Sequence, residues 1–187
     1  HLWRVNPDNC RWEHLKTVAE GLVAVSGAGR HVYALGYWGH VLYQYDTSTG
    51  VTKRIVVGSV GGHVSRNMLA DANGHAYVPR LAARPDGKVS AMLVEYDSEL
   101  REQAVTPLEF YLDAGSPDSN HGIVGVASLP DGRLLFTTHR GQIYQIEPAP
   151  HKSAAVTALG WIHPDGDAYA PSLFALGGTL VASVTGR

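Results

Sequence analysis

The sequence is short of cysteine, of charge and of long apolar runs, and each shortage narrows the class of protein. Cys10 is the only cysteine among 187 residues, so no disulfide can form within the chain. No apolar run approaches the ~20 residues that a membrane-spanning helix needs, and we expect no membrane span. The cysteine count does not fix the compartment, because many exported or periplasmic proteins have none. Since the chain begins at His1, we expect its natural start and any signal peptide to lie outside this sequence.

Charged residues make up only 17% of the chain, and the formal net charge is −2. Lysine and arginine are scattered and form no basic stripe, which excludes nucleic acid as the expected partner. The sequence also has no glycine-rich phosphate loop, no Gly-x-Ser-x-Gly elbow and no Cys-x-x-Cys pair. Nucleotide-binding, serine-hydrolase and zinc-finger functions are therefore set aside, and a hydrophobic content of 44% predicts a globular domain.

What the sequence does have is a repeated pattern of strands and glycine turns. The turns occupy residues 27–30, 72–75, 130–133 and 176–179. Their second glycines (Gly29, Gly74, Gly132 and Gly178) are 45, 58 and 46 residues apart. Short segments that alternate apolar and polar residues surround each turn, as half-buried strands do. Four antiparallel strands at this spacing are typical of propeller blades, and residues 107–120 of the longer interval are predicted to be an inserted loop.

The predicted fold is an all-β propeller of four-stranded antiparallel blades, with four blade-equivalents in a partial propeller or a four-bladed ring. Aromatic residues of the third strands, such as Trp3 and Tyr144, are expected to pack between blades. The chain is expected to form one domain that divides into outer strands at 1–15, blades at 18–57, 63–108 and 121–161, and inner strands at 167–187.

Two segments carry a family resemblance. Asn120-His121-Gly122-Ile123 and residues 129–138, a Pro-Asp-Gly turn with the strand after it, resemble the blade unit of streptogramin-lyase-like propellers, and residues 65–77 are a diverged copy. The wider group includes NHL repeats and the regucalcin and gluconolactonase propellers. The resemblance implies the fold, but these blades are similar in lyases, lactonases and binding modules alike.

The two ends of the chain complement each other. Residues 185–187 followed by residues 1–6 parallel residues 139–147, so the termini together would make one blade. Three interpretations of the chain are possible: a piece of a longer propeller, a four-bladed ring closed by its own termini, or one of two copies that complete an eight-bladed ring. A second chain or a missing segment is thus an expected partner for completing the ring.

Candidate site residues come from the same register. Counting back 11 residues from the turn glycine reaches His63, His121 and Asp167, each beside a loop at the start of an inner strand. Inner strands of successive blades line one channel, so these residues are expected at one channel mouth. Imidazoles and a carboxylate there can hold a divalent cation such as Mg²⁺ or Ca²⁺ or supply a general base, with His63 and Asp167 as ligands. The alternative is structural: such residues also hydrogen-bond the neighbouring blade.

Further residues point to binding at the same mouth. Arg66 can pair with a substrate carboxylate, Asn67 can contact substrate or metal, and an exposed Trp38 on a loop is a binding contact. The lyase resemblance implies that His121 acts as a base near bound magnesium. His63 matches that motif in position only, because Gly62-His63-Val64 lacks the following Gly-Ile.

The leading functional hypothesis is therefore a propeller that binds a small molecule or a protein at its channel mouth. The first alternative is a metal-assisted lyase or lactone-directed enzyme that uses His121 and His63. The second is a structural interaction module. The substrate or ligand and the oligomeric state do not follow from these residues.

Overall fold

The computed structural model of the chain describes residues 1–111 and 122–186. Strands dominate it, and its one helical element is the short 3-10 turn η1 (Val60–Gly62) within the described residues. The strands are β1 (Leu2–Asn6), β2 (Arg11–Lys16), β3 (Leu22–Ala28), β4 (His31–Gly36), β5 (Val41–Asp46), β6 (Thr52–Val56), β7 (Leu69–Ala70), β8 (Ala76–Ala83), β9 (Val89–Tyr96), β10 (Glu102–Leu108), β11 (Ile123–Ser128), β12 (Leu134–Thr138), β13 (Gln142–Glu147), β14 (Ala155–Trp161), β15 (Ala168–Leu176) and β16 (Thr179–Gly186).

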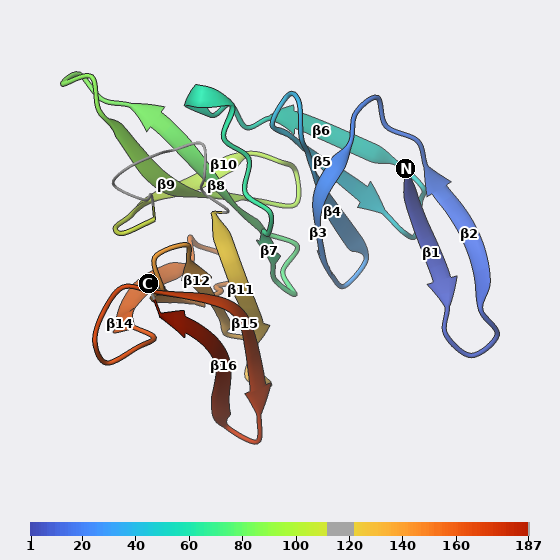
Figure 1. Cartoon of the computed structure of the whole chain (residues 1–187). Coiled ribbons are helices and arrows are strands. Elements are labelled where there is room, and N and C mark those ends of the chain that lie inside the picture. The colour runs from blue at the N-terminus through green and yellow to red at the C-terminus, as the bar shows by residue number, and fades with distance from the viewer. Residues whose placement is uncertain (112–121, 187) are drawn as a thin grey trace.

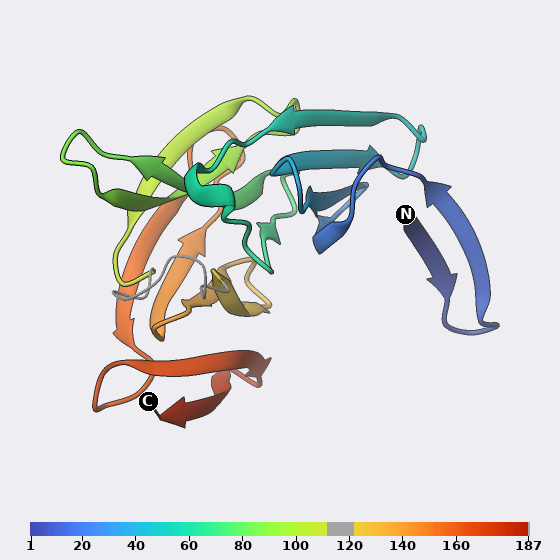
Figure 2. The same ribbon diagram turned by 45° about the horizontal axis from the view of Figure 1, so that its top comes forward.

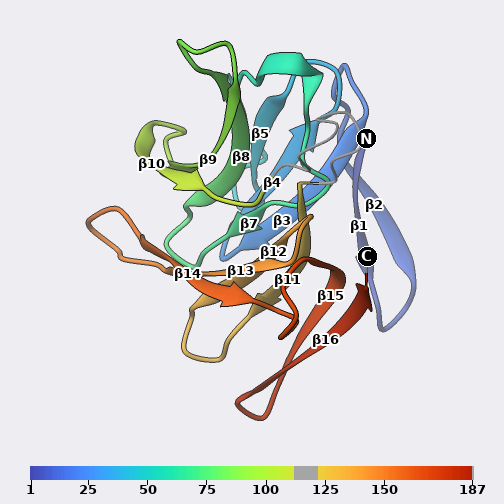
Figure 3. The same ribbon diagram turned by 60° about the vertical axis from the view of Figure 1, so that its left-hand side comes forward.

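These strands form three complete sheets and two hairpins (Figure 1). The four-stranded antiparallel sheets are β3-β4-β5-β6, β7-β8-β9-β10 and β11-β12-β13-β14, each in chain order. The hairpin β1-β2 precedes them and the hairpin β15-β16 follows. The sheets succeed one another around an arc, and the two hairpins lie at its ends (Figures 2 and 3). The first strands contact one another, β3 with β7 and β11 with β15, so they form the inner edge of the arc.

This is the predicted architecture of a β-propeller, with three complete blades and two half blades. The predicted turn glycines have the required geometry, with φ of +60° at Gly29, +81° at Gly74, +89° at Gly132 and +80° at Gly178. An L side chain rarely adopts this left-handed conformation, so glycine at these positions lets each inner strand turn tightly into the next strand. Turn chemistry in the sequence therefore sets the register of every blade.

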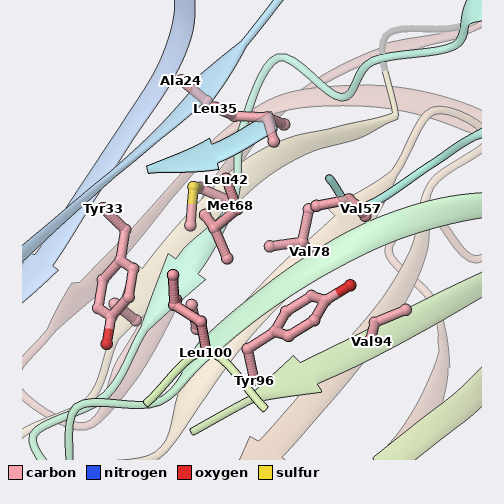
Figure 4. Close-up of a cluster of buried hydrophobic side chains, with 12 residues drawn as sticks. Ala24, Tyr33, Leu35, Leu42, Val57, Met68, Val78, Val94, Tyr96 and Leu100 are labelled. Atoms are coloured by element: carbon pink, nitrogen blue, oxygen red, sulfur yellow. The ribbon is translucent and has the colours of Figure 1, made fainter. Parts of the chain in front are cut away.

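The hydrophobic core lies between adjacent sheets rather than within them. Tyr33, Leu35 and Leu42 of the first complete sheet pack against Val78 and Tyr96 of the second (Figure 4). A second cluster joins the second sheet to the third, and there Phe136 stacks on Tyr144 with 5.1 Å between ring centroids. Buried apolar area of this kind is the main stabilising contribution in a stacked fold.

Two details differ from the sequence expectation. The inner strand β7 is only two residues long, and just before it the side chain of Asn67 donates to the backbone of the neighbouring sheet. Trp3 is 53% exposed, whereas Tyr96 and Tyr144 are buried between blades as expected. The physical reason for the exposure of Trp3 is that its hairpin has no sheet stacked on that face within the described residues. Most of the predicted inserted loop, residues 112–120, lies outside the described residues.

Candidate functional site

His63, Arg66, Asn67, Asp167 and Trp38, the described residues among those singled out in the sequence, lie on one face of the arc. It is the face where the loops from second to third strands emerge together with the segments that cross from one sheet to the next. We call it the crossover face. Its segments include residues 17–21, 37–40, 57–68, 139–141 and 162–167. Hydrogen bonds join some of these segments: Tyr37 N donates to Gly21 O at 2.8 Å, and Ala168 N donates to Arg140 O at 3.0 Å.

His63 is buried on this face, directly after η1. Its Nε2 is 2.9 Å from the hydroxyl oxygen of Tyr111, and the two rings meet edge to face. Burial lowers the pKa of His63 to about 4, so the imidazole is neutral at ordinary pH. The partner of His63 is 48 residues away in sequence, and no local pattern could have identified it.

Asn67 joins two inner strands. Its Nδ2 donates to the carbonyl oxygens of Val124 at 2.9 Å and Ile123 at 3.2 Å. Ser65 Oγ accepts from Ile123 N at 3.0 Å. Gly122, which has a φ of +73°, lies so close that an added Cβ would meet Ser65 and the Tyr111 hydroxyl. The amide predicted to contact substrate is thus engaged between blades, and His121, the predicted base, lies outside the described residues.

Asp167 lies at the start of β15, where Arg140 Nε donates to its Oδ2 at 2.7 Å. The Arg140 guanidinium also lies over the ring of Phe110, 5.4 Å from the centroid. His63 and Asp167 therefore have different partners. Across residues 1–111 and 122–186, no three His, Cys, Asp or Glu side chains come close enough to hold a metal ion. On their own, the described residues do not supply a Mg²⁺ or Ca²⁺ site.

Arg66 and Trp38 are both exposed on the crossover face. Arg66 makes no ion pair with another described residue. Trp38 is 80% exposed, and its ring meets that of Tyr37 edge to face at 5.0 Å. Together with the half-exposed Tyr37 it presents a large aromatic surface at the tip of the β4–β5 loop.

Glu20 holds that loop in place. It lies two residues after Val18, the position reached by counting back 11 residues from Gly29. Its Oε2 accepts from the backbone N–H groups of Trp38 at 2.9 Å and Gly39 at 3.0 Å. Its Oε1 accepts from the hydroxyl of Tyr43 at 2.9 Å. The carboxylate lies against Gly36, where a Cβ would collide with it. Charge-assisted hydrogen bonds of this kind fix a loop before a ligand arrives.

His40, next to this loop, was not predicted as a site residue. It is 5% exposed, its backbone is left-handed with a φ of +46°, and neither ring nitrogen has a hydrogen-bond partner among the described residues. Burial, together with the nearby His63 and Arg80, lowers its pKa to about 4 against the opposing effect of Glu20. The sequence carries no signal for this burial, because it depends on how two blades pack.

Comparisons with known proteins were made for the sequence and for the structure. No family model matches the chain. No curated protein matches it either. No helix in the described part of the chain is long and apolar enough to cross a membrane.

Solved structures of other proteins resemble this chain in fold. A chain of the nidogen–laminin complex superposes with a TM-score of 0.58 and 11% identity, over 97% of this chain and 63% of that one. A chain of the complex of KlAtg21 with the coiled coil of AgAtg16 gives 0.63 and 14%, over 97% of this chain and 54% of that one. This chain thus spans less than two thirds of the length of either. At such identities the likeness shows the fold alone, which agrees with the sheet order: the chain is a β-propeller.

Proposed function

We propose that this chain is a protein-binding propeller that contacts its partner through the crossover face, with Trp38 as the central contact. One observation carries the proposal: an indole that is 80% exposed stands on a loop whose backbone donates two hydrogen bonds to Glu20, and Tyr43 of β5 donates a third to the same carboxylate. A large apolar ring held in water on an ordered loop is costly unless a partner covers it.

The physical properties of this loop suit a protein partner. Tryptophan, tyrosine and arginine dominate the binding energy of protein interfaces, and Tyr37, Trp38 and Arg66 are all exposed on this face. Because Glu20 already orders the loop, binding costs less conformational entropy than it would for a free loop. Arg66 is the expected cationic contact, since no described residue neutralises it.

The structural neighbours support the same class of function. The similar chains come from a nidogen–laminin complex and from a complex with a coiled coil, and both are protein–protein assemblies. The alternative of a lyase or lactone-directed enzyme gains no support from the described residues, because the ring of His63 is bonded to Tyr111 and Asp167 is bonded to Arg140. A catalytic His121 and a bound Mg²⁺ or Ca²⁺ stay predictions, which metal analysis of the purified protein would test.

Peptide selection tests the proposal. A random displayed peptide library is selected on the immobilised chain, with a soluble Trp38→Ala chain present as competitor. We expect peptides whose affinity falls about tenfold or more on Trp38→Ala, as for a hot-spot tryptophan, and by a smaller factor on Arg66→Ala. The matched control is Val51→Ala, which removes an exposed apolar side chain from the turn face opposite and should change nothing. Recovered peptides that bind Trp38→Ala as tightly as the unaltered chain would contradict the proposal.

A further inference from the structure

The loop that carries Trp38 ends on a buried histidine. His40 is the last residue of the β4–β5 loop, and its carbonyl oxygen accepts from Val57 N at 2.9 Å. The two side chains differ in environment, because His40 is buried whereas Trp38 is mostly in water. Since only Gly39 separates the two residues, any movement of the His40 backbone changes the position of the indole.

Two features make the buried position of His40 costly to maintain. Its φ lies in the left-handed region, which few residues with a side chain adopt. Both ring nitrogens are buried, and neither has a hydrogen-bond partner among the described residues. A neutral imidazole leaves a donor and an acceptor unsatisfied there. The ring is therefore held by the packing around it, and any added penalty favours its departure.

The surroundings of His40 oppose a positive charge on its ring. Burial has the largest effect, and His63 after η1 and Arg80 on β8 act in the same direction. Arg80 is itself held by Glu102, with Nη1 and Oε2 2.9 Å apart. Glu20, in front of β3, is the one group of this set that attracts the charge. A protonated ring would also bring two N–H donors to a position where the described residues offer no acceptor.

We propose that His40 controls the Trp38 loop in response to pH: a proton on its ring expels the side chain and frees the loop from Glu20. The expelled residue leaves the left-handed conformation, and Trp38 and Gly39 then lose their hydrogen bonds to the carboxylate. Glu20 takes part in both states, because it accepts from the loop when His40 is buried and attracts the imidazolium afterwards. This inference rests on the proposed function, since it assigns a regulation to the same contact.

The difference in proton affinity sets how strongly pH acts on the loop. A released histidine has the ordinary pKa of 6.5, whereas the buried ring has a pKa of about 4. The released state therefore binds the proton first, and acid favours it. From pH 7.5 to pH 5 the ratio of released to held loop rises about 30-fold. The partner should consequently bind in neutral solution and dissociate in mild acid.

Nuclear magnetic resonance tests the release of the loop without any partner. In the unaltered chain, the amide signals of Trp38 and Gly39 should shift together between pH 7.5 and pH 5. His40→Asn tolerates the left-handed backbone and takes up no proton, so it should remove the shift. His40→Gly, which accepts the same backbone, replaces that variant if it does not fold. Loop signals that follow pH in His40→Asn as they do in the unaltered chain would overturn the proposal.

Peptide affinity measured against pH tests the consequence for binding. The probe is a selected peptide with capped ends and no histidine, aspartate or glutamate, and circular dichroism confirms intact sheets at each pH. Its dissociation constant should rise about tenfold or more from pH 7.5 to pH 5, and His40→Asn should abolish the rise. The exposed His151→Asn is the matched control and should keep it.

The two experiments separate this proposal from the proposed function. If no peptide is selected, the proposed function fails, and the loop signals still decide whether His40 releases the loop. Peptides that bind equally at both pH values would overturn the release and leave the binding function standing. A rise that disappears in His63→Gln but persists in His40→Asn would place the sensor at His63 and contradict the assignment to His40.

Discussion

The central sheets and the terminal hairpins are built from the same kind of strand, yet their aromatic residues differ sharply in solvent exposure. Tyr33, Tyr77 and Phe136 of the central sheets are inaccessible to solvent, whereas Trp3 and Trp12 of the first hairpin are half exposed or more. The difference lies in the neighbours: a central sheet is covered by other sheets, while a hairpin at the end of the arc is not. A blade therefore gains its stability from stacking, and its own sequence is not sufficient.

The largest effect of a single substitution should come from the stacked core. Phe136→Ala removes a fully buried ring that stacks on Tyr144, and we expect the free energy of unfolding to fall by about 3–5 kcal/mol. In a dilute sample, Trp12→Ala should change it by less than about 0.5 kcal/mol, because the ring is mostly in water. Urea denaturation of both variants measures the contrast. Equal losses would mean that the hairpin is packed as the central sheets are.

Acid should weaken the junction between the first two complete sheets. His40 and His63 have folded-state pKa values of about 4, below the ordinary value of 6.5, so the unfolded chain binds their protons first. Stability is thus complete above pH 6.5 and falls as the pH drops towards 4, by about 3 kcal/mol for each imidazole.

Urea midpoints measured from pH 7.5 down to 4 would show this loss. His40→Asn keeps a residue that tolerates the left-handed backbone and should remove about half of the pH dependence. The exposed His151→Asn serves as control and should leave the dependence unchanged. A profile of His40→Asn that matches the unaltered chain would mean that this imidazole is not buried.

The next largest loss of stability should follow removal of the Asn67 hydrogen bonds that join two inner strands. Asn67→Ala removes the amide that donates to Ile123 and Val124 and leaves two carbonyl groups without that donor. We expect a loss of about 1–3 kcal/mol in the free energy of unfolding. Asn73→Ala, in an exposed turn, is the control with little expected change. If both variants were equally stable, the inner strands would not depend on this amide.

The smallest change in stability should accompany Glu20→Ala. The carboxylate orders a surface loop, so its loss should cost only about 1 kcal/mol of global stability. Binding of the selected peptides should weaken more than stability does, because Trp38 is no longer held in place. Calorimetric titration alongside thermal denaturation separates the two effects. Unchanged peptide affinity would show that the loop needs no anchor.

The fold could be predicted from the sequence because its signals are local. The glycine turns, the alternation of apolar residues and the spacing of the repeats all lie within single blades. Residues 185–187 and 1–6 continue the pattern of 139–147, and that the two ends belong to one blade stays a prediction. The exposure of Trp3 could not be predicted from the sequence, because burial of a third-strand aromatic depends on whether another sheet lies beside it.

The site was less predictable because its contacts are long-range. Trp38 could be proposed as an exposed loop residue from its position alone. The bond between His63 and Tyr111 spans 48 residues, and the bonds from Glu20 to the loop of Trp38 span about as many positions as a whole hairpin. The unpartnered ring of His40 depends on the packing of two sheets. Such contacts follow from the arrangement of blades and leave no local pattern.

Hydrogen exchange measured by mass spectrometry tests most directly the contrast between stacked blades and open half blades. In dilute protein, the amides of β4, β8 and β12 should exchange slowly, while those of β1 and β16 should exchange fast. Equal protection in all five strands would contradict the account.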